Sequence, residues 1–323
     1  MEIPDISFGI ITDIQYADTP NGLNYTGDKV RYFRNSVFIL GDAVKHWNTA
    51  PGQINFVLQL GDIIDGCNAS TSGASRKSLE KITQIFSQLK CPVYHVTGNH
   101  ELYNFKRELL KDTKIQSSYL SPGVTSDPRG KNYYTFSPIG GFRVIVLDTF
   151  DTSLLGVDTD SSEYEQTLEL FRQYNQNEDM NDSSGLSPDV CMYAAYNGAV
   201  SERQLKWLEQ TLSEAERRQE KVVVAGHNPI YTDSADAYCL CWNHGDVTKV
   251  LHCHSSCILA YFAGHDHSGS FARDNDGLSH ITFPGVVDTE PGNSCHATVH
   301  IFADKMKIDG FGVVPSYTLP FRT

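Results

Sequence analysis

Six short apolar runs, most of them followed at once by a polar cluster, constrain the fold of this chain more than any other feature. The runs are rich in β-branched and aromatic side chains and have the length of strands. They cover residues 7–12, 54–60, 92–96, 142–148, 221–226 and 257–264. Because near-continuous apolar runs indicate burial on both sides, we expect strands buried on both faces of a sheet.

Helical patterns lie between several of these runs. Residues 28–48 and 76–89 each carry apolar side chains at helical spacing along one stripe, as crossover helices do. Two more helices are expected after capping boxes, which pair Ser162 with Glu165 and Ser201 with Gln204. The second of these helices is predicted over residues 202–219, directly before a strand.

The pattern changes from about residue 269, where short strands alternate with turns. Asn275, Asp276 and Gly277 form a hairpin signal in this region, which favours a second, more antiparallel sheet. The chain shows no internal repeat and no long linker, so we expect residues 1–323 to form one domain of the α/β class. Residues 151–190 are a candidate lid or insertion, since 175–189 is acidic, polar and poor in apolar anchors.

Composition limits the classes of function. The chain is 40% hydrophobic and 20% charged, as in an ordinary globular protein, and has no apolar stretch of membrane-spanning length. A net charge of −13 argues against attraction to nucleic acid or to an anionic membrane. We identify no secretory signal, so we expect a cytoplasmic protein whose eight cysteines are free thiols. We also expect a monomer that acts on a small molecule.

The polar clusters offer side chains that bind metal ions. They contain Asp13, Gln15, Asp62, Asn99, His100, Glu101, His227, His265, Asp266 and His267. In open α/β sheets ligands bind beyond the carboxyl ends of strands, so we expect all five clusters to meet at one place. Each cluster alone has an ordinary explanation as a turn glycine with a solvated neighbour. Together they supply more ligands than a single tetrahedral site needs, which favours a pair of metal ions.

The order of these clusters resembles that of the calcineurin-like metallophosphoesterase superfamily. The resemblance implies a four-layer α/β sandwich, in which two central mixed β-sheets are flanked by helices. It also implies ligand roles: Asp13, Gln15 and His267 at the first metal, Asp62 as the bridge, and Asn99, His227 and His265 at the second. His100 and Asn99 are the implied catalytic residues beside the phosphate.

Gln15 departs from the superfamily pattern, in which most members have His at this position. An amide oxygen is a harder ligand than imidazole and favours Mn²⁺ or Mg²⁺ over Zn²⁺. We therefore expect two Mn²⁺ ions, with Mg²⁺, Fe or Zn²⁺ as alternatives. A decayed metal site is the other interpretation of Gln15, and it is disfavoured because every other ligand is present.

The expected reaction is hydrolysis by a hydroxide that bridges two metals and attacks phosphorus in line with the leaving oxygen. His100 would stabilise charge on the phosphoryl oxygens and protonate the leaving group. Glu101 would either orient the imidazole of His100 or start a helix as an exposed acid.

Short motifs narrow the substrate. Residues 61–66 lack the arginine of the phosphoprotein-phosphatase motif GDxxDRG, which disfavours a protein substrate. ITDIQYAD at 11–18, together with GNHELYNF, HNPIY and AGHDHSG, is similar to the manganese-dependent ADP-ribose/CDP-alcohol diphosphatases. That resemblance implies cleavage of the phosphoanhydride in ADP-ribose, CDP-choline and other CDP-alcohols to a nucleoside monophosphate and a phosphate ester. A cyclic-nucleotide phosphodiesterase of the same superfamily and a non-catalytic protein-binding scaffold are the alternatives.

Candidate substrate contacts lie near the ligand positions in the sequence. The aromatic candidates for stacking on a nucleobase are Tyr16, Tyr25, Tyr103 and Phe105. Cys239 follows the HNPIY motif and is expected to border the same pocket. Ordinary packing explains these residues equally well, so both interpretations stay open.

Two further groups have both a functional and a structural interpretation. Lys29, Arg31 and Arg34 belong to the predicted helix over 28–48 and either contact a diphosphate or face solvent. The string His252-Cys253-His254-x-x-Cys257 has loose spacing for a structural zinc site. Reduced cysteines that pack against a helix are therefore favoured at this string.

Overall fold

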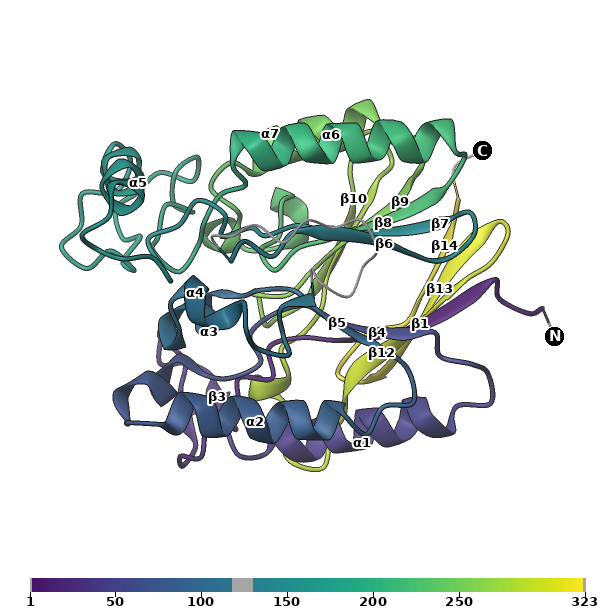
Figure 1. Cartoon of the computed structure of the whole chain (residues 1–323), viewed down its shortest axis with the longest axis horizontal. Coiled ribbons are helices and arrows are strands. Elements are labelled where there is room, and N and C mark those ends of the chain that lie inside the picture. The colour runs from purple at the N-terminus through teal and green to yellow at the C-terminus, as the bar shows by residue number, and fades with distance from the viewer. Residues whose placement is uncertain (1, 118–129, 322–323) are drawn as a thin grey trace.

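Two six-stranded sheets lie face to face at the centre of the molecule, with helices on the outer side of each sheet (Figure 1). The computed structural model describes residues 2–117 and 130–321. Both sheets mix parallel and antiparallel pairs. The four-layer α/β sandwich implied by the sequence motifs is therefore confirmed. No helix within the described ranges is long and apolar enough to cross a membrane.

The first sheet has the strand order β14-β13-β12-β1-β4-β5. Its strands are β1 Ile6–Ile11, β4 Phe56–Gln59, β5 Val93–His95, β12 Cys295–Ile301, β13 Lys305–Gly312 and β14 Tyr317–Pro320. The three N-terminal strands run parallel, and β12 pairs antiparallel with β1. Helices α1 (Ser36–Thr49) and α2 (Ala74–Phe86) lie along its outer side (Figure 1).

The second sheet has the strand order β10-β11-β9-β8-β7-β6. Its strands are β6 Tyr134–Ile139, β7 Phe142–Val146, β8 Lys221–Ala225, β9 Ile258–Ala263, β10 Ser270–Arg273 and β11 Ser279–Thr282. Strands β7, β8, β9 and β11 are parallel neighbours in this sheet. Helices α6 (Glu202–Arg217) and α7 (His244–Cys253) cover its outer side (Figure 1).

Shorter elements complete the described chain. They are the hairpin strands β2 Gly22–Leu23 and β3 Val30–Arg31, the helices α3 Asn99–Asn104, α4 Arg107–Leu110 and α5 Ser162–Arg172, and the 3-10 turns Gly66–Ser70, Thr232–Ser234, Ala237–Cys239 and Val286–Asp288. Most of these elements lie at the end of the sandwich where the polar clusters are found (Figure 1). Some of them also add to the core, as α3 and α4 do through Leu102 and Leu110.

Aromatic side chains fill the space between the two sheets. The rings of Phe8 and Phe56 stack with centroids 4.6 Å apart within the first sheet. The ring of Phe8 also lies 6.4 Å from that of Phe262, which belongs to the second sheet. All six residues of β1 are buried. Burial on both faces explains why the strands are recognisable as continuous apolar runs.

Local hydrogen bonding shortens the first predicted helix. The sequence predicted a helix over 28–48, whereas α1 begins at Ser36 and residues 30–31 belong to a hairpin. The side chain of Asn24 accepts hydrogen bonds from the backbone N–H groups of Asp28 and Lys29 at 3.0 and 3.1 Å. Asparagine caps of this kind compete with helix formation, so the apolar stripe is helical over its second part alone.

Long-range pairing also corrects the expectation for the C-terminal strands. They do not form a separate antiparallel sheet, because β12, β13 and β14 extend the first sheet while β10 and β11 extend the second. The hairpin over Asn275, Asp276 and Gly277 is present between β10 and β11. Ser201 caps α6 as predicted, but the cap of α5 is Ser161 instead of Ser162.

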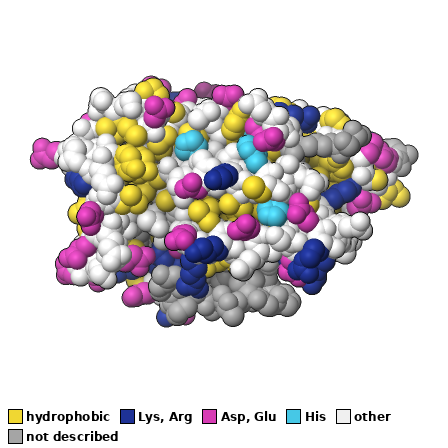
Figure 2. Space-filling view, turned by 90° about the horizontal axis from the view of Figure 1, so that it is seen from above, with side chains coloured by type: hydrophobic (Ala, Val, Ile, Leu, Met, Phe, Trp, Pro, Cys, Tyr) yellow, Lys and Arg dark blue, Asp and Glu magenta, His cyan; other side chains and the backbone are white. Residues whose placement is uncertain are grey.

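Basic side chains form no continuous patch on the face shown in Figure 2. Lys and Arg lie in small groups among acidic side chains there. This distribution agrees with the net charge of −13 and gives nucleic acid no extended basic surface on that face.

Gly9 allows α1 to lie close to the first sheet, which gives a stability prediction. A Cβ at Gly9 would overlap the indole ring of Trp47, whereas a Cβ at Gly41 within α1 meets nothing within 4 Å. We expect Gly9→Ala to lower the free energy of unfolding by about 1–3 kcal/mol through overpacking. The control Gly41→Ala should raise it by about 0.5–1 kcal/mol through helix propensity. Urea unfolding measures both, and equal effects would contradict the close packing at Gly9.

Candidate active site

The polar clusters of the two sheets meet at one end of the sandwich. His227 follows β8 of the second sheet, yet its Nδ1 lies 2.7 Å from the carbonyl oxygen of Leu60, which follows β4 of the first. His265, after β9, donates its backbone N–H to Asp13, after β1, at 3.0 Å. The carboxyl ends of strands from both sheets therefore build a single site, as the sequence predicted.

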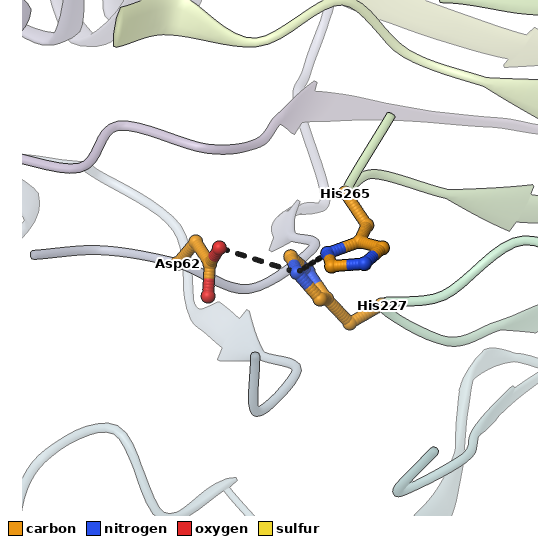
Figure 3. A group of neighbouring side chains, drawn as sticks. All are labelled: Asp62, His227 and His265. Atoms are coloured by element: carbon orange, nitrogen blue, oxygen red, sulfur yellow. Dashed lines mark hydrogen bonds and ion pairs between the residues drawn. The ribbon is translucent and has the colours of Figure 1, made fainter. Parts of the chain in front are cut away.

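One half of the site is centred on Asp62, His227 and His265, whose ligand atoms all lie within 4.8 Å of one another (Figure 3). Nε2 of His227 is 3.3 Å from Asp62 Oδ2 and 3.2 Å from His265 Nδ1. The side-chain oxygen of Asn99 lies 3.2 Å from the same nitrogen. Four side chains from four separate clusters therefore point to one small volume.

The other half of the site contains Asp13, Gln15 and His267. Asp13 Oδ1 is 3.3 Å from His267 Nε2. The amide nitrogen of Gln15 lies 3.0 Å from the same imidazole nitrogen and 3.1 Å from Asp62 Oδ2. Because Asp62 Oδ2 also faces His227, a single carboxylate oxygen connects the two halves.

Outer hydrogen bonds fix which nitrogen of each imidazole faces the centre. The outward nitrogen of His227 donates to the carbonyl oxygen of Leu60 at 2.7 Å. That of His265 donates to the side-chain oxygen of Asn197 at 2.7 Å, and that of His267 to the carboxylate of Asp288 at 3.1 Å. With the proton held on the outer nitrogen, the inner nitrogen of a neutral imidazole carries a lone pair. Such outer partners are typical of histidines that bind metals.

These inward atoms fit a metal ion. When both rings are neutral, as metal binding requires, the inward nitrogens of His227 and His265 present lone pairs to each other at 3.2 Å. The buried oxygens Asp13 Oδ1 and Gln15 Oε1 have no hydrogen-bond partner among the described residues. Buried polar atoms without partners are costly, and bound cations satisfy both the lone pairs and the carboxylate charges. The donor set of carboxylate, amide and imidazole therefore suits divalent metals.

The electrostatics of the histidines support the same conclusion. Burial lowers the pKa of His227, but the carboxylates of Asp62 and Asp13 outweigh it and raise this pKa to about 9. Burial is likewise outweighed at His267, where Asp13 and Asp288 raise the pKa to about 10. The carboxylates thus draw positive charge to the imidazole nitrogens, and a metal ion can provide that charge in place of a proton.

Backbone strain is concentrated at the same residues. Positive φ angles occur at five non-glycine residues of the described chain, and four of them are Asp13 (50°), Gln15 (41°), Asp62 (58°) and His265 (68°). Such conformations cost about 1–3 kcal/mol each and persist where the surrounding structure imposes them. The strain directs the side chains inward at the ends of their strands.

His100 stands beside this centre with a defined tautomer. Its Nδ1 accepts a hydrogen bond from the backbone N–H of Gly66 at 2.7 Å, so a neutral ring carries its proton on Nε2. That nitrogen lies 3.8 Å from Asp62 Oδ2. The ring of Tyr103 packs edge-on against the imidazole with centroids 5.6 Å apart. The proton of His100 is therefore presented next to the carboxylate that both halves share.

Glu101 starts a helix, which is one of the two roles considered for it, because it lies in the first turn of α3 and completes a capping box with Gly98, although it is buried and not exposed. It is fully buried, and its carboxylate accepts the backbone N–H groups of Asp62, Ile63 and Gly98 at 2.9, 2.6 and 2.9 Å. Burial and the charge of Asp62 raise the pKa of Glu101 to about 7, against the opposing effect of these three donors. Glu101 ties the loop of Asp62 to the loop of Asn99 instead of orienting His100.

A family model described as calcineurin-like phosphoesterase matches residues 6–269, a range that contains every side chain of the two halves. The chain belongs to the calcineurin-like phosphoesterase family. The match begins at the first residue of β1 and ends just beyond His267. All five polar clusters of this phosphoesterase therefore lie inside the family domain.

Individual relatives agree with the family match over nearly the whole chain. Curated relatives from Bos taurus and Homo sapiens, both named manganese-dependent ADP-ribose/CDP-alcohol diphosphatase, are 41% identical over 98% of this chain and 94% and 93% of their own. A relative of the same name from Arabidopsis thaliana is 36% identical over 95% of this chain and 94% of its own. A crystal structure of a dimetal phosphatase from Danio rerio matches with TM-score 0.93 and 36% identity, over 99% of this chain and 100% of that one.

A cavity of about 510 Å³ opens onto the metal-type cluster of this phosphoesterase. Tyr25, Tyr103 and Cys239 line it together with His100, as expected from the sequence. Tyr16 does not, because its side chain is buried under Lys81, whose ammonium group donates to the tyrosine hydroxyl at 2.7 Å. The expectation of a substrate contact at Tyr16 is therefore wrong. Phe105 packs against the hydrophobic core and is not among the residues that line the cavity.

The basic residues of the N-terminal region separate into two environments. Lys29 and Arg31 line the cavity from the hairpin that contains β2 and β3. Arg34 forms an exposed ion pair with Asp18 at 2.7 Å and is not among the lining residues. Two of the three residues therefore lie where a charged substrate could reach them.

The string around Cys253 does not converge on a metal. His252 pairs with Asp274 and Asp276, whereas His254 pairs with Glu216. All eight cysteines are free thiols, and Cys253 itself is exposed. Within the described residues, the single group of three or more His, Cys, Asp or Glu side chains with ligand atoms within 4.8 Å of one another is Asp62, His227 and His265.

Sequence reasoning missed the residues that hold the ligands in place. Asn197 lies in an irregular segment, and no local pattern distinguishes it. Asp288 follows a strand, β11, just as the five clusters do, so the same rule applied to residues 283–288 would have found it. Asp288 was not predicted as a site residue because the region from about residue 269 was assigned to a separate sheet.

The position of Glu101 gives a second prediction. Replacing Glu101 by Gln places an amide N–H against a backbone N–H, so we expect a loss of about 1–3 kcal/mol in the free energy of unfolding. Because the loop of Asp62 loses a partner, Mn²⁺ affinity should fall by roughly 10–100-fold. Urea unfolding and calorimetric Mn²⁺ titration measure the two effects. The matched control is Glu80→Gln on the exposed side of α2, and an Mn²⁺ affinity unchanged in Glu101→Gln would contradict the assigned role.

Proposed function

We propose that this phosphoesterase is a manganese-dependent diphosphatase that hydrolyses the phosphoanhydride of ADP-ribose, CDP-choline and other CDP-alcohols. The observation that carries the proposal is that animal and plant relatives of this name align with almost the entire chain. The products would be a nucleoside monophosphate and a second phosphate ester. The cluster of buried, unpartnered metal-type atoms beside the cavity supports the same reaction class.

Two ions would be held by the two halves of the site. Asp13, Gln15 and His267 form one ligand set, and Asn99, His227 and His265 form the other. Asp62 is assigned to both, and the position of its Oδ2 at 3.1 Å from Gln15 and 3.3 Å from His227 supports this shared role. When bound, a metal pair supplies Lewis acidity toward the phosphoryl oxygens and activates a water for in-line attack.

The protein's own groups would act on the phosphate and the leaving oxygen. His100 presents Nε2–H, which can donate a hydrogen bond to a phosphoryl oxygen or to the leaving oxygen as negative charge develops on it. Asn99 begins α3 directly before His100, so the two side chains are placed together by one short helix. Glu101 holds both loops in register through its three backbone hydrogen bonds.

The nucleoside part of the substrate would lie among the tyrosines of the cavity. Its volume of about 510 Å³ falls in the range of small-molecule sites. Tyr25, Tyr103 and Cys239 are the proposed contacts. The hydroxyls of Tyr25 and Tyr103 donate to Asp179 and Asn181 at 3.1 and 3.3 Å, which supports the assignment of residues 151–190 as a lid.

Solution properties complete the proposal. We assign a small molecule as the partner and a monomer as the active form. Eight free thiols support a reducing compartment such as the cytoplasm.

A substrate panel tests this function. With Mn²⁺ present, the purified protein should release AMP from ADP-ribose and CMP from CDP-choline, while cyclic AMP stays intact. Replacing Asp62 by Ala should abolish turnover because both ions lose a shared ligand. Turnover of cyclic AMP alone would establish the phosphodiesterase instead, and no turnover of any ester or anhydride would support a binding scaffold.

Gln15 gives a separate prediction about metal choice. Replacing Gln15 by His should keep ADP-ribose hydrolysis while shifting metal preference from Mn²⁺ toward Zn²⁺, because imidazole is the softer ligand. Rates and calorimetric affinities measured for each metal in the variant and the parent protein test this. The same order of metals in both proteins would show that Gln15 does not set the preference.

A further inference from the structure

Two cations line the cavity of a strongly acidic protein. Lys29 and Arg31 are the Lys and Arg residues among the described lining residues, and both come from the hairpin between β1 and α1. The chain as a whole carries a net charge of −13, so positive charge in this cavity is a local feature. A diphosphate substrate carries one phosphate that is attacked and a second that is not. The second phosphate needs its own positive partner.

Arg31 is fixed beside both halves of the centre. Its Nη1 lies 3.4 Å from Asp65 Oδ2, and its Nε lies 4.0 Å from Asp288 Oδ1. The same Asp65 oxygen is 3.4 Å from His100 Nδ1, and Asp288 contacts His267 at 3.1 Å. The guanidinium therefore sits between His100 and His267, one of the proposed metal ligands.

Arg31 retains hydrogen-bonding capacity in this position. A guanidinium has five N–H donors, and the structure gives this one a single hydrogen bond, from Nη1 to Asp65. Its Nε is buried and faces Asp288, so the donors left for a ligand in the cavity are those of the two Nη atoms. Lys29 donates to the hydroxyl of Ser268 at 2.8 Å and has no carboxylate within ion-pair distance in the described chain. Both cations can therefore accept a further anionic partner.

The residue after Asp65 is the place of the arginine in the motif GDxxDRG, whereas in this chain the cation beside Asp65 is Arg31 of the hairpin. Gly66 stands in that place, and a Cβ at this residue would lie 3.3 Å from the ring of Tyr103 and 3.4 Å from Nδ1 of His100. A side chain at 66 would therefore crowd the ring of Tyr103 and touch His100. Arg31 reaches the same Asp65 from a distant part of the sequence.

We propose that Arg31, assisted by Lys29, binds the phosphate of a diphosphate substrate that is not attacked. This subsite selects diphosphates over compounds with a single phosphate. A planar guanidinium matches phosphate oxygens through two parallel N–H groups, which lysine cannot reproduce. The assignment deepens the proposed function and rests on it.

A purely structural role of Arg31 is the competing explanation of the same contacts. Arg31 could act through Asp65 and Asp288 by keeping His100 and His267 in position. In that case its loss would reduce activity on every substrate to the same extent. Diphosphates and a single-phosphate diester therefore separate the two explanations.

The kinetic test compares ADP-ribose and CDP-choline with bis(4-nitrophenyl) phosphate. Arg31→Ala should lower kcat/KM for the two diphosphates by about 10–100-fold, the usual effect of losing a charged hydrogen bond, and change that for the diester by less than about threefold. Arg31→Lys should lie between, since it keeps the charge without the planar fork. Arg34→Ala is the matched control, because Arg34 pairs with Asp18 outside the cavity.

A binding measurement gives a readout that does not depend on turnover. Calorimetry with the Mn²⁺-loaded protein compares adenosine 5′-(α,β-methylene)diphosphate with AMP. The parent protein and Arg34→Ala should prefer the methylene diphosphate, and Arg31→Ala should lose that preference. Equal losses for the diester and the diphosphates, or an unchanged preference in Arg31→Ala, would overturn the subsite. If the parent protein cleaves no diphosphate, the proposed function fails, while the binding preference still decides the role of Arg31.

Discussion

The carboxylate of Asp62 is the point at which the two halves of the site depend on each other. Its Oδ2 faces Gln15 on one side and His227 on the other, while its Oδ1 accepts the backbone N–H of His100 at 2.8 Å. A buried carboxylate is costly unless positive charge and hydrogen bonds compensate it. Glu101 secures the backbone of Asp62, and the surrounding imidazoles and oxygens leave room for cations to supply the charge. The rest of the fold serves to bring these groups together.

Neither sheet could form this site alone. Asp13, Asp62 and Asn99 follow strands of the first sheet, whereas His227 and His265 follow strands of the second. The aromatic layer between the sheets fixes their separation, since interiors packed at this density deform little. The same rigidity maintains the positive φ angles at the ligand positions. Packing in the core thus determines the distances of about 3 Å between ligand atoms at the carboxyl ends of the strands.

Charge in the cavity is arranged by long-range contacts. The sequence motif lacks an arginine after Asp65, and this absence disfavoured a protein substrate. The hairpin returns Arg31 to Asp65, so a cation is present although its place in the motif is empty.

The sequence by itself determined six of the strands, the fold class and the side chains that meet at the site, because apolar runs and polar residues at strand ends are local signals. Five of these strands are almost wholly buried, whereas β5 is partly exposed. Tertiary structure alone decided that residues 30–31 form a hairpin, that Tyr16 is buried under Lys81, and that Glu101 binds three backbone N–H groups. It also decided that Asn197 and Asp288 orient the histidines, and that the C-terminal strands extend both sheets. These features depend on partners far apart in the chain, whose pairing is set by packing and hydrogen bonding of the whole fold and leaves no local pattern.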